Sequence, residues 1–309
     1  MSQRDVKNRI ASVKNIQKIT RAMEMVAAAR LRRAEERIAH LRPYAGAIRR
    51  MTRTAAGVAE NIPNLPILNE HEREDSVGLL LVTGDRGLAG AFNSQIIRAG
   101  LRAAAEHEAA GRAVRFSATG RRGVSSLLFR GRELEGQYVG FTDRPAFSDA
   151  RRIAGDLMVD FVDNKVDRVE IIYNGYISPL SQVVRCETLL PLQQASILDG
   201  DAAAEAEAEA EAEAEADLSA GHVHALVEYE PDPEEILKRL VPDYVEISVY
   251  RALLESTASE HGARMTAMRS ASENAGEIIE DLTLEMNRAR QAEITQEIME
   301  VVAGAEALT

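Results

Sequence analysis

The chain has little of what marks secreted or membrane-spanning proteins. Its 309 residues include a single cysteine, Cys186, so neither an intrachain disulfide nor a cysteine-based metal cluster can form. It has no tryptophan, and aromatic residues make up 4% of the sequence. It lacks a run of roughly 18 apolar residues that would span a bilayer, and its N-terminus lacks the apolar segment of a signal peptide. Because Ala, Glu and Arg are abundant, we expect a helix-rich protein. From the absences above, we expect it to be neither secreted nor membrane-spanning.

The charges of the chain are unevenly distributed. Lys and Arg number 37 and Asp and Glu number 49, which makes the net charge −12. Residues 1–60 hold 14 basic and 5 acidic side chains, whereas residues 231–309 hold 7 basic and 16 acidic ones. A further 9 acidic residues and no basic residue lie within 199–217. Opposite charges at the two ends predict either two helices that attract each other or a rod that meets partners of differing sign.

The N-terminal region has the pattern of one long helix. Residues 3–58 contain a single proline, Pro43. Apolar residues recur at spacings of three and four, as on one face of a helix. This spacing predicts a packing stripe formed by Val6, Ile10, Val13, Ile16, Ile19, Met23 and Val26.

The C-terminal region is also helical by pattern. We expect Pro242 to break the helix once, after which residues 243–307 contain no proline. Further on, an apolar ladder slips by a five-residue step, and such a slip often marks where a rod changes neighbours. The ladder consists of Ile279, Leu282, Met286 and Ala289, and the step leads to Ile294. Together the two terminal helices predict an antiparallel coiled coil that projects from a globular base.

Between these helices the chain alternates strands and helices. Apolar runs predict strands over 77–83, 114–118, 137–141, 168–173 and 181–189, and periodicity predicts helices over 91–108, 121–129 and 149–163. This order is typical of a mostly parallel sheet with helices on its faces. Pro179, between the last two strands, favours an antiparallel hairpin. The expected fold class is therefore α/β, with a Rossmann-like central domain and a long antiparallel coiled coil from the terminal helices.

The sequence offers little that could carry out catalysis. The glycine-rich turn at 84–90 follows a strand and opens a helix, which is where a nucleotide fingerprint would lie. It lacks the leading GxG of that fingerprint and the lysine of a P-loop, so we interpret it as a tight turn. His222 and His224 form a weak metal-site candidate in a loop, and Cys186 is expected to be a small core residue.

Three motifs of the chain resemble the gamma subunit of F-type ATP synthases. They are residues 9–28 (RIASVKNIQKITRAMEMVAA), 83–93 (TGDRGLAGAFN) and 287–305 (NRARQAEITQEIMEVVAGA). Residues 230–233 (EPDP) also precede the last helix as they do in that family. The resemblance runs nearly from one end of the chain to the other.

This resemblance implies a rotor shaft. The terminal helices would pair inside a hexamer of alpha and beta subunits, and the α/β domain would bind the epsilon subunit and the membrane c-ring. Proton flow would turn ring and shaft together and drive ATP synthesis in the hexamer. The chain would then hold no catalytic, cofactor or metal site and bind no nucleic acid. It would be a peripheral protein on the cytoplasmic face of the cell membrane.

The resemblance also implies which residues touch the stator. Met23 matches a position near an acidic loop of the catalytic subunit, although packing between the two helices is the other interpretation. Arg290 and Gln291 match positions at the catch loop of that subunit, where the other interpretation is a solvated helix face. The remaining expected rotor–stator contacts are Arg30, Arg33, Thr295 and Glu297.

The expected division of the chain follows from these patterns. It comprises an N-terminal shaft helix (1–60), an α/β domain (75–198), an acidic insertion (199–221) and a C-terminal shaft helix (232–309). Two other interpretations remain open, namely a nucleotide-binding α/β protein with coiled-coil extensions and a generic coiled-coil scaffold. The first lacks phosphate-cradling residues, and the second does not explain the matched central domain.

The insertion is the main departure from the family pattern. Residues 204–216 alternate Ala and Glu strictly, so neither a helix nor a strand would bury an apolar face. We therefore predict a solvated, disordered segment that is either a spacer or a tether. A tether would slow reverse rotation by binding a basic neighbour.

Deletion of residues 199–217 separates these two roles. A tether predicts faster ATP hydrolysis by the assembled complex at low salt, with a smaller effect at moderate salt because ions screen the attraction. Hydrolysis rates that stay unchanged at both salt concentrations would eliminate the tether.

Overall fold

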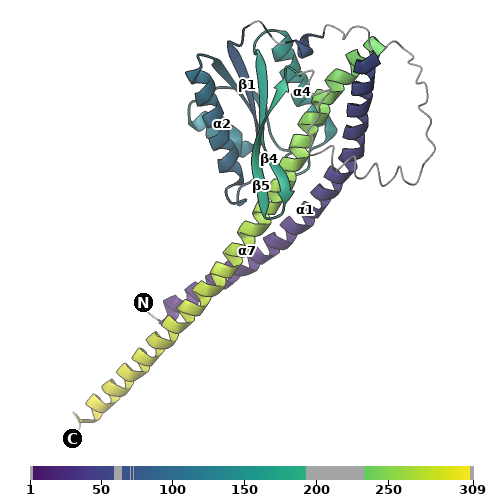
Figure 1. Ribbon diagram of the computed structural model, residues 1–309. Helices are drawn as coiled ribbons and strands as arrows, with labels where there is room; N and C mark the ends of the chain where they lie inside the picture. The colour runs from purple at the N-terminus through teal and green to yellow at the C-terminus, as the bar shows by residue number, and fades with distance from the viewer. Residues whose placement is uncertain (1–2, 59–64, 70, 72, 193–232, 307–309) are drawn as a thin grey trace, which may run out of the picture.

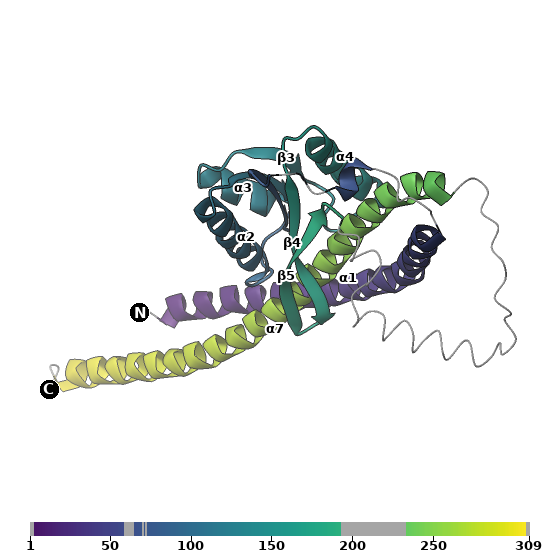
Figure 2. The same ribbon diagram turned by 45° about the horizontal axis from the view of Figure 1, so that its top comes forward.

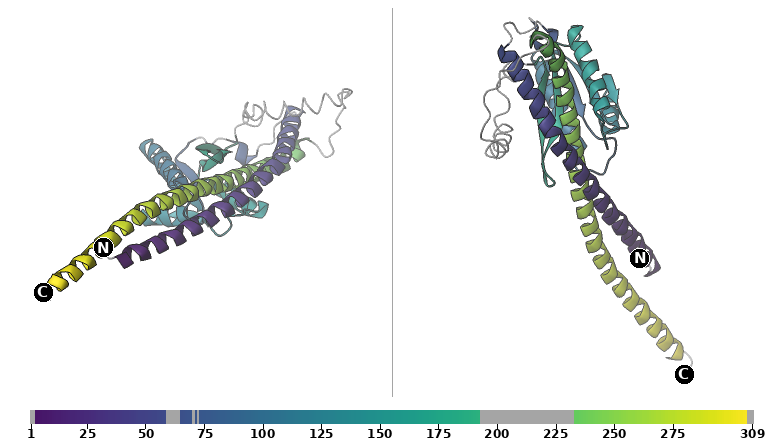
Figure 3. Two further views of the ribbon diagram at one scale, coloured as in Figure 1. Left: turned by 90° about the horizontal axis from the view of Figure 1, so that it is seen from below. Right: turned by 90° about the vertical axis from the view of Figure 1, so that its right-hand side faces the viewer.

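Two long terminal helices and an α/β domain make up the molecule (Figure 1). The computed structural model describes residues 3–58, 65–69, 71, 73–192 and 233–306. Helix α1 spans Gln3–Val58 and helix α7 spans Pro233–Glu306. The two helices lie side by side in opposite directions, and the start of α1 and the end of α7 both point away from the α/β domain (Figures 1 and 3). The antiparallel helical pair is thereby confirmed, and we call it the shaft.

The central sheet has five strands in the order β3-β2-β1-β4-β5. Their bounds are β1 Ser76–Val82, β2 Ala113–Thr119, β3 Leu134–Tyr138, β4 Arg168–Ser178 and β5 Ser181–Leu190. Strand β1 pairs in parallel with β2 and β4, and β2 pairs in parallel with β3. Strand β5 forms an antiparallel hairpin with β4. The predicted mostly parallel sheet, with its antiparallel addition, is confirmed.

Helices cover both faces of this sheet (Figure 2). Helices α2 (Phe92–Ala109) and α3 (Arg121–Phe129) pack on one face, in a core that includes Leu79, Leu81 and Phe116. Helix α4 (Phe147–Val162) and the first part of α7 pack on the other face, together with the short 3-10 helix Pro66–Leu68. Strand β1 is covered on both sides, which explains its nearly continuous apolar sequence.

Two of the sequence predictions are wrong in detail. The third strand occupies Leu134–Tyr138 rather than 137–141, because the chain turns at Gly140, which has a positive φ of 94°. Helix α7 runs through Pro242 without ending. Val241 and Val245 beside the proline are 1% and 0% exposed, so core packing holds this turn of the helix. We infer that burial outweighs the roughly 3 kcal/mol that an internal proline costs.

The N-terminus of α3 depends on Gly120. This residue caps the helix with φ 80° and ψ 140°, a conformation that favours glycine. A Cβ atom here would lie 2.3 Å from the carbonyl oxygen of Thr83, which is far inside van der Waals contact. Helix α3 can therefore approach the end of β1 closely only because residue 120 has no side chain.

Gly111 provides a matched control for this close approach. It has a similar φ of 82°, but nothing lies within 4 Å of the place that a Cβ atom would occupy. We expect Gly111→Ala to lower the free energy of unfolding by about 1–2 kcal/mol through backbone strain. Gly120→Ala should cost clearly more because the clash adds to the strain. Urea unfolding of the full chain measures both, and equal losses would contradict the close packing.

Candidate functional site in the helical pair

The face of α1 that meets α7, here called the seam, follows a strict alternation of four- and three-residue steps. It consists of Val6, Ile10, Val13, Gln17, Thr20, Glu24, Ala27, Leu31, Ala34 and Ile38, all buried or half-buried. Such a seven-residue repeat is typical of coiled coils. Apolar clusters hold the seam at both ends. Val6 and Ile10 pack with Leu282, and Leu31 and Ala34 pack with Ala258.

The middle of the seam is polar. The side-chain nitrogen of Gln17 donates to the backbone oxygen of Ser272 across the helix pair, at 3.2 Å. The carboxylate of Glu24 accepts from Arg269 of α7, with Nε and Oε1 2.9 Å apart. In this ion pair the acidic residue lies on α1, which is basic overall, and the basic residue lies on α7, which is acidic overall. The seam is therefore held by apolar packing at its ends and by specific polar contacts at its centre, whereas other cations of α1, such as Arg21 and Arg33, are exposed.

Part of the predicted packing stripe on α1 is wrong. Ile16, Ile19 and Val26 are 53%, 58% and 53% exposed, and Met23 is half-buried. After Val13 the seam advances by four residues to Gln17, not by three to Ile16. Ile16, Ile19 and Val26 therefore lie on a face of α1 that points away from α7, where they form an exposed hydrophobic strip.

The other helix leaves the seam where the sequence pattern slips. Ile279, Leu282 and Met286 pack against α1, as the ladder predicts, and Ala289 is half-buried. Every residue from 290 to 303 is exposed. We call this segment the tip, because α7 extends here beyond the start of α1 (Figure 3). Its exposed apolar side chains are Ile294, Ile298, Met299, Val301 and Val302.

The predicted contact residues occupy different settings. Arg290, Gln291, Thr295 and Glu297 lie on the tip and are exposed, and the Thr295 hydroxyl donates to the backbone oxygen of Gln291. Arg33 is exposed on α1. Arg30, by contrast, pairs with Asp143 of the α/β domain, with Nη1 and Oδ2 2.8 Å apart. The structure thus assigns Arg30 an internal link between shaft and base, and the stator contacts remain predictions.

The glycine-rich turn at 84–90 lies where nucleotides bind in open α/β sheets. Ligands of such folds occupy the crevice at the carboxyl ends of the strands, where the strand order reverses. Here that point lies between β1 and β4. Helix α7 fills it, because Ser256 donates to the backbone oxygen of Val82 and Ser259 donates to that of Asn174. The crevice is thus a contact between two parts of the same chain.

Charged groups of α7 are buried at this crevice. Glu260 is 1% exposed, and its carboxylate lies against Gly84, where a Cβ atom would be 2.6 Å away. Arg264 pairs with Glu260 and donates to the backbone oxygen of Gly87 at 3.2 Å. Burial, aided by the charge of Arg264, lowers the pKa of His261 to about 4, so this imidazole is neutral near pH 7. A phosphate here would meet the Glu260 carboxylate, which disfavours the nucleotide-binding alternative.

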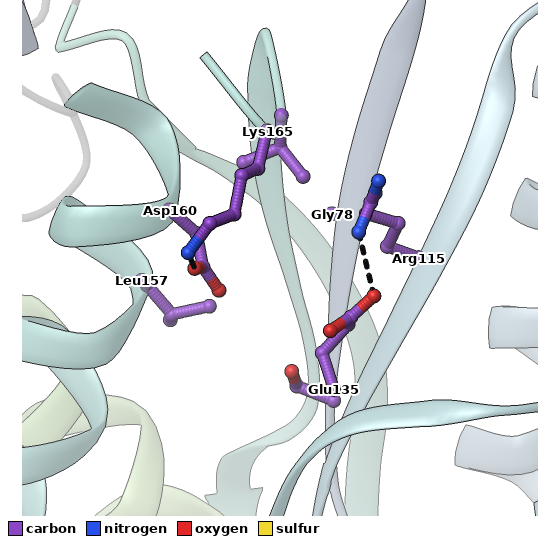
Figure 4. Close-up of a pocket in the computed structure, with 8 residues that line it drawn as sticks. Gly78, Arg115, Glu135, Leu157, Asp160 and Lys165 are labelled. Carbon is purple, nitrogen blue, oxygen red and sulfur yellow. Dashed lines mark hydrogen bonds and ion pairs between the residues drawn. The ribbon is translucent and has the colours of Figure 1, made fainter. Parts of the chain in front are cut away.

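A shallow pocket on the sheet offers no better anion site (Figure 4). It is lined by Gly78, Arg115, Ser117, Glu135, Leu157, Asp160, Lys165 and Val166. The two cations are already paired, because Lys165 Nζ lies 2.8 Å from Asp160 Oδ1 and Arg115 Nη1 lies 2.6 Å from Glu135 Oε1. The pocket therefore presents balanced charge.

The remaining candidates differ in whether they lie within the described residues. Within the described ranges, no group of three or more His, Cys, Asp or Glu side chains could hold a metal ion. His222, His224 and the acidic insertion lie outside those ranges. Cys186 is exposed on edge strand β5, so its expected place in the core is wrong. None of the described helices combines the length and apolar character needed to cross a membrane.

A long antiparallel helical pair on an α/β base defines a stalk-type subunit. The family model described as ATP synthase matches residues 2–308. The ATP synthase gamma chain of Rubrobacter xylanophilus is 41% identical over 99% of this chain and 98% of its own length. That of Nostoc punctiforme is 42% identical over 98% of both chains. The chain belongs to the ATP synthase gamma chain family.

Solved structures agree with this assignment. The central stalk of the Tetrahymena thermophila mitochondrial ATP synthase is 26% identical, with a TM-score of 0.58, over 82% of this chain and 99% of that one. A chain of the Euglena gracilis mitochondrial ATP synthase shares the fold, with a TM-score of 0.62 and 17% identity over 99% and 94% of the two chains. The resemblance, the fold class and the central-stalk rotor function expected from the sequence are confirmed.

The corrected seam predicts a contrast between two isoleucines of α1. Ile10 is 8% exposed and packs in the seam, whereas Ile19 is 58% exposed. We expect Ile10→Gln to lower the free energy of unfolding of the full chain by about 2–4 kcal/mol, because it buries a polar group and removes packing. Ile19→Gln should stay within about 0.5 kcal/mol of the original chain. Similar losses in urea unfolding would favour the stripe predicted from spacing alone.

Proposed function

We propose that this chain rotates inside a hexamer of alternating alpha and beta subunits. In this proposal the tip reaches into the hexamer, and the α/β base binds the epsilon subunit and a membrane c-ring. The ring would carry the proton flow that turns the shaft. The chain itself has no catalytic role and is attached through the complex to the cytoplasmic face of the cell membrane.

The observation that carries this proposal is the exposed tip of α7. Fourteen consecutive residues, 290–303, are exposed, although they include several large apolar side chains. A single helix with apolar residues in water is poorly stabilised on its own, because most helical stability in proteins comes from packing. A surrounding sleeve of partner subunits would supply that packing.

The shaft is also unequal around its circumference. One side of α1 carries the exposed strip that includes Ile16, Ile19 and Val26, while Arg21 projects from another side of the helix. A rotor with unequal faces contacts three surrounding sites differently at each angle. Rotation would therefore shift each catalytic subunit between conformations according to how well each conformation fits the face it meets. This is how a chain without an active site would drive a chemical cycle.

The predicted contact residues suit this role to different degrees. Arg290, Gln291, Thr295 and Glu297 lie on the free tip, and Arg33 is exposed, so all five are available to a partner. Met23 is half-buried and Arg30 is already paired with Asp143. We therefore propose the tip residues, with Arg290 and Gln291 first, as the main contacts with the catalytic subunits.

Charge reversal at two neighbouring arginines tests this assignment. Arg288 and Arg290 are both exposed, but on a helix they point about 160° apart. In a complex reconstituted from alpha, beta and this chain, we expect Arg290→Glu to lower ATP hydrolysis at least severalfold. Arg288→Glu, the matched control, should change it less than twofold.

The outcomes of this test are distinct. If both variants hydrolyse ATP like the original complex, Arg290 is not a stator contact. If both variants lose activity equally, this end of α7 acts through its overall charge and not through one face. If the unmodified chain fails to co-purify with a hexamer that hydrolyses ATP, the rotor proposal as a whole is wrong.

A further inference from the structure

The carboxylate of Asp85 is enclosed by hydrogen-bond donors. Its Oδ1 accepts from the backbone nitrogens of Arg121 and Gly140 at 3.1 and 3.0 Å. Its Oδ2 accepts from the nitrogens of Gly140 and Thr142, at 2.9 and 3.2 Å, and from the Thr142 hydroxyl at 2.9 Å. Three backbone N–H groups and one hydroxyl therefore converge on a single negative charge.

This arrangement resembles the way proteins hold a phosphate. The donors come from the first residue of α3 and from the loop after β3, at the carboxyl ends of the strands. A helix N-terminus carries partial positive charge and unpaired N–H groups, which favour an anion. Here the anion is a side chain of the same chain. Burial opposes ionisation of Asp85, but the hydrogen bonds from Gly140, Thr142 and Arg121 lower its pKa below the ordinary value.

Asp85 connects two segments that hold the shaft, namely its own turn and the loop after β3. Its own turn accepts from Arg264 of α7 through the backbone oxygen of Gly87. The backbone oxygen of Thr142 accepts from the Thr257 hydroxyl of α7 at 2.9 Å. The next residue, Asp143, pairs with Arg30 of α1. Both shaft helices are therefore attached to loops that the Asp85 carboxylate holds together.

We propose that Asp85 is a positioning residue that acts as a built-in anion, occupying a phosphate-type cradle and thereby fixing α7 to the base. The cradle keeps the donor geometry of a ligand site, but its occupant is covalently part of the chain. Loss of the carboxylate would leave three N–H groups without their acceptor, and the loops that hold Thr257 and Arg264 would loosen. Only an anion of similar size could restore them.

Chemical rescue tests the cradle in the full chain. We expect Asp85→Gly to lower the thermal unfolding midpoint by roughly 5–10 °C. Sodium formate should restore at least half of that loss, and formamide, which has the same shape without the charge, should not. Sodium chloride is added to the formamide solution so that its ionic strength equals that of the sodium formate solution. Asp85→Asn, whose side chain fills the cradle with an amide, should be destabilised without rescue by formate.

Either of two results would overturn the cradle. The first is that formate and formamide raise the thermal unfolding midpoint of Asp85→Gly equally. The second is that neither compound raises it. If this variant does not fold on expression, its refolding yield from urea replaces the midpoint as the measurement. The yield should then rise in formate at least severalfold over formamide, and equal yields count against the proposal.

Hydrogen exchange tests the attachment of α7. In Asp85→Gly we expect amides of residues 251–264 to exchange at least tenfold faster, and formate should reverse this change. Residues 290–303 of the free tip are the internal control and should exchange unchanged. Unchanged exchange at 251–264 would show that the carboxylate does not fix the helix.

A last measurement rests on the proposed function. In the assembled ATP synthase, Asp85→Gly should lower the ratio of ATP-driven proton pumping to ATP hydrolysis, and formate should restore it. An unchanged ratio would overturn the role of Asp85 in the rotor. Because the rescue and exchange experiments use the chain alone, a failure of the complex to form would count against the proposed function and not against the cradle.

Discussion

The structure depends on the burial of one helix against two different surfaces. The first part of α7 packs on the sheet through residues such as Val241, Val245 and Val249, and its later part pairs with α1 around Leu282. The sheet would expose an apolar face without this helix, and α1 would lose its packing along the seam. Because α7 is a single helix of 74 residues, it connects the base to the shaft without a break.

This constraint also explains why a nucleotide-type fold has no room for a nucleotide at its usual site. The crevice at the strand ends is an apolar and polar contact surface for α7, with Ser256, Ser259 and Arg264 bonded to the loops and strands around it. Two carboxylates, those of Asp85 and Glu260, lie near the place a phosphate would need. At the place where related folds bind a ligand, this fold therefore attaches helix α7.

Much of the architecture could be predicted from local patterns. The apolar run of β1, the hairpin around Pro179 and the two terminal helices were all expected because burial and periodicity act over a few residues. The bounds of β3 and the continuation of α7 through Pro242 could not be predicted in this way, since each depends on residues far away in the chain. Gly140 leaves the strand to bind Asp85, and Val241 and Val245 hold the proline turn in the core.

The candidate site divides in the same way. By itself, the sequence determined that the apolar ladder of α7 slips after Ala289, because this follows from spacing along one helix. It also predicted, from the helical pattern and opposite charge of the two ends, that the terminal helices pair. Only the tertiary structure decided that Gln17 rather than Ile16 enters the seam, and that Arg30 binds Asp143. The physical reason is that one helix can carry two apolar faces. Contacts with residues far away in the chain decide which of the two faces is buried.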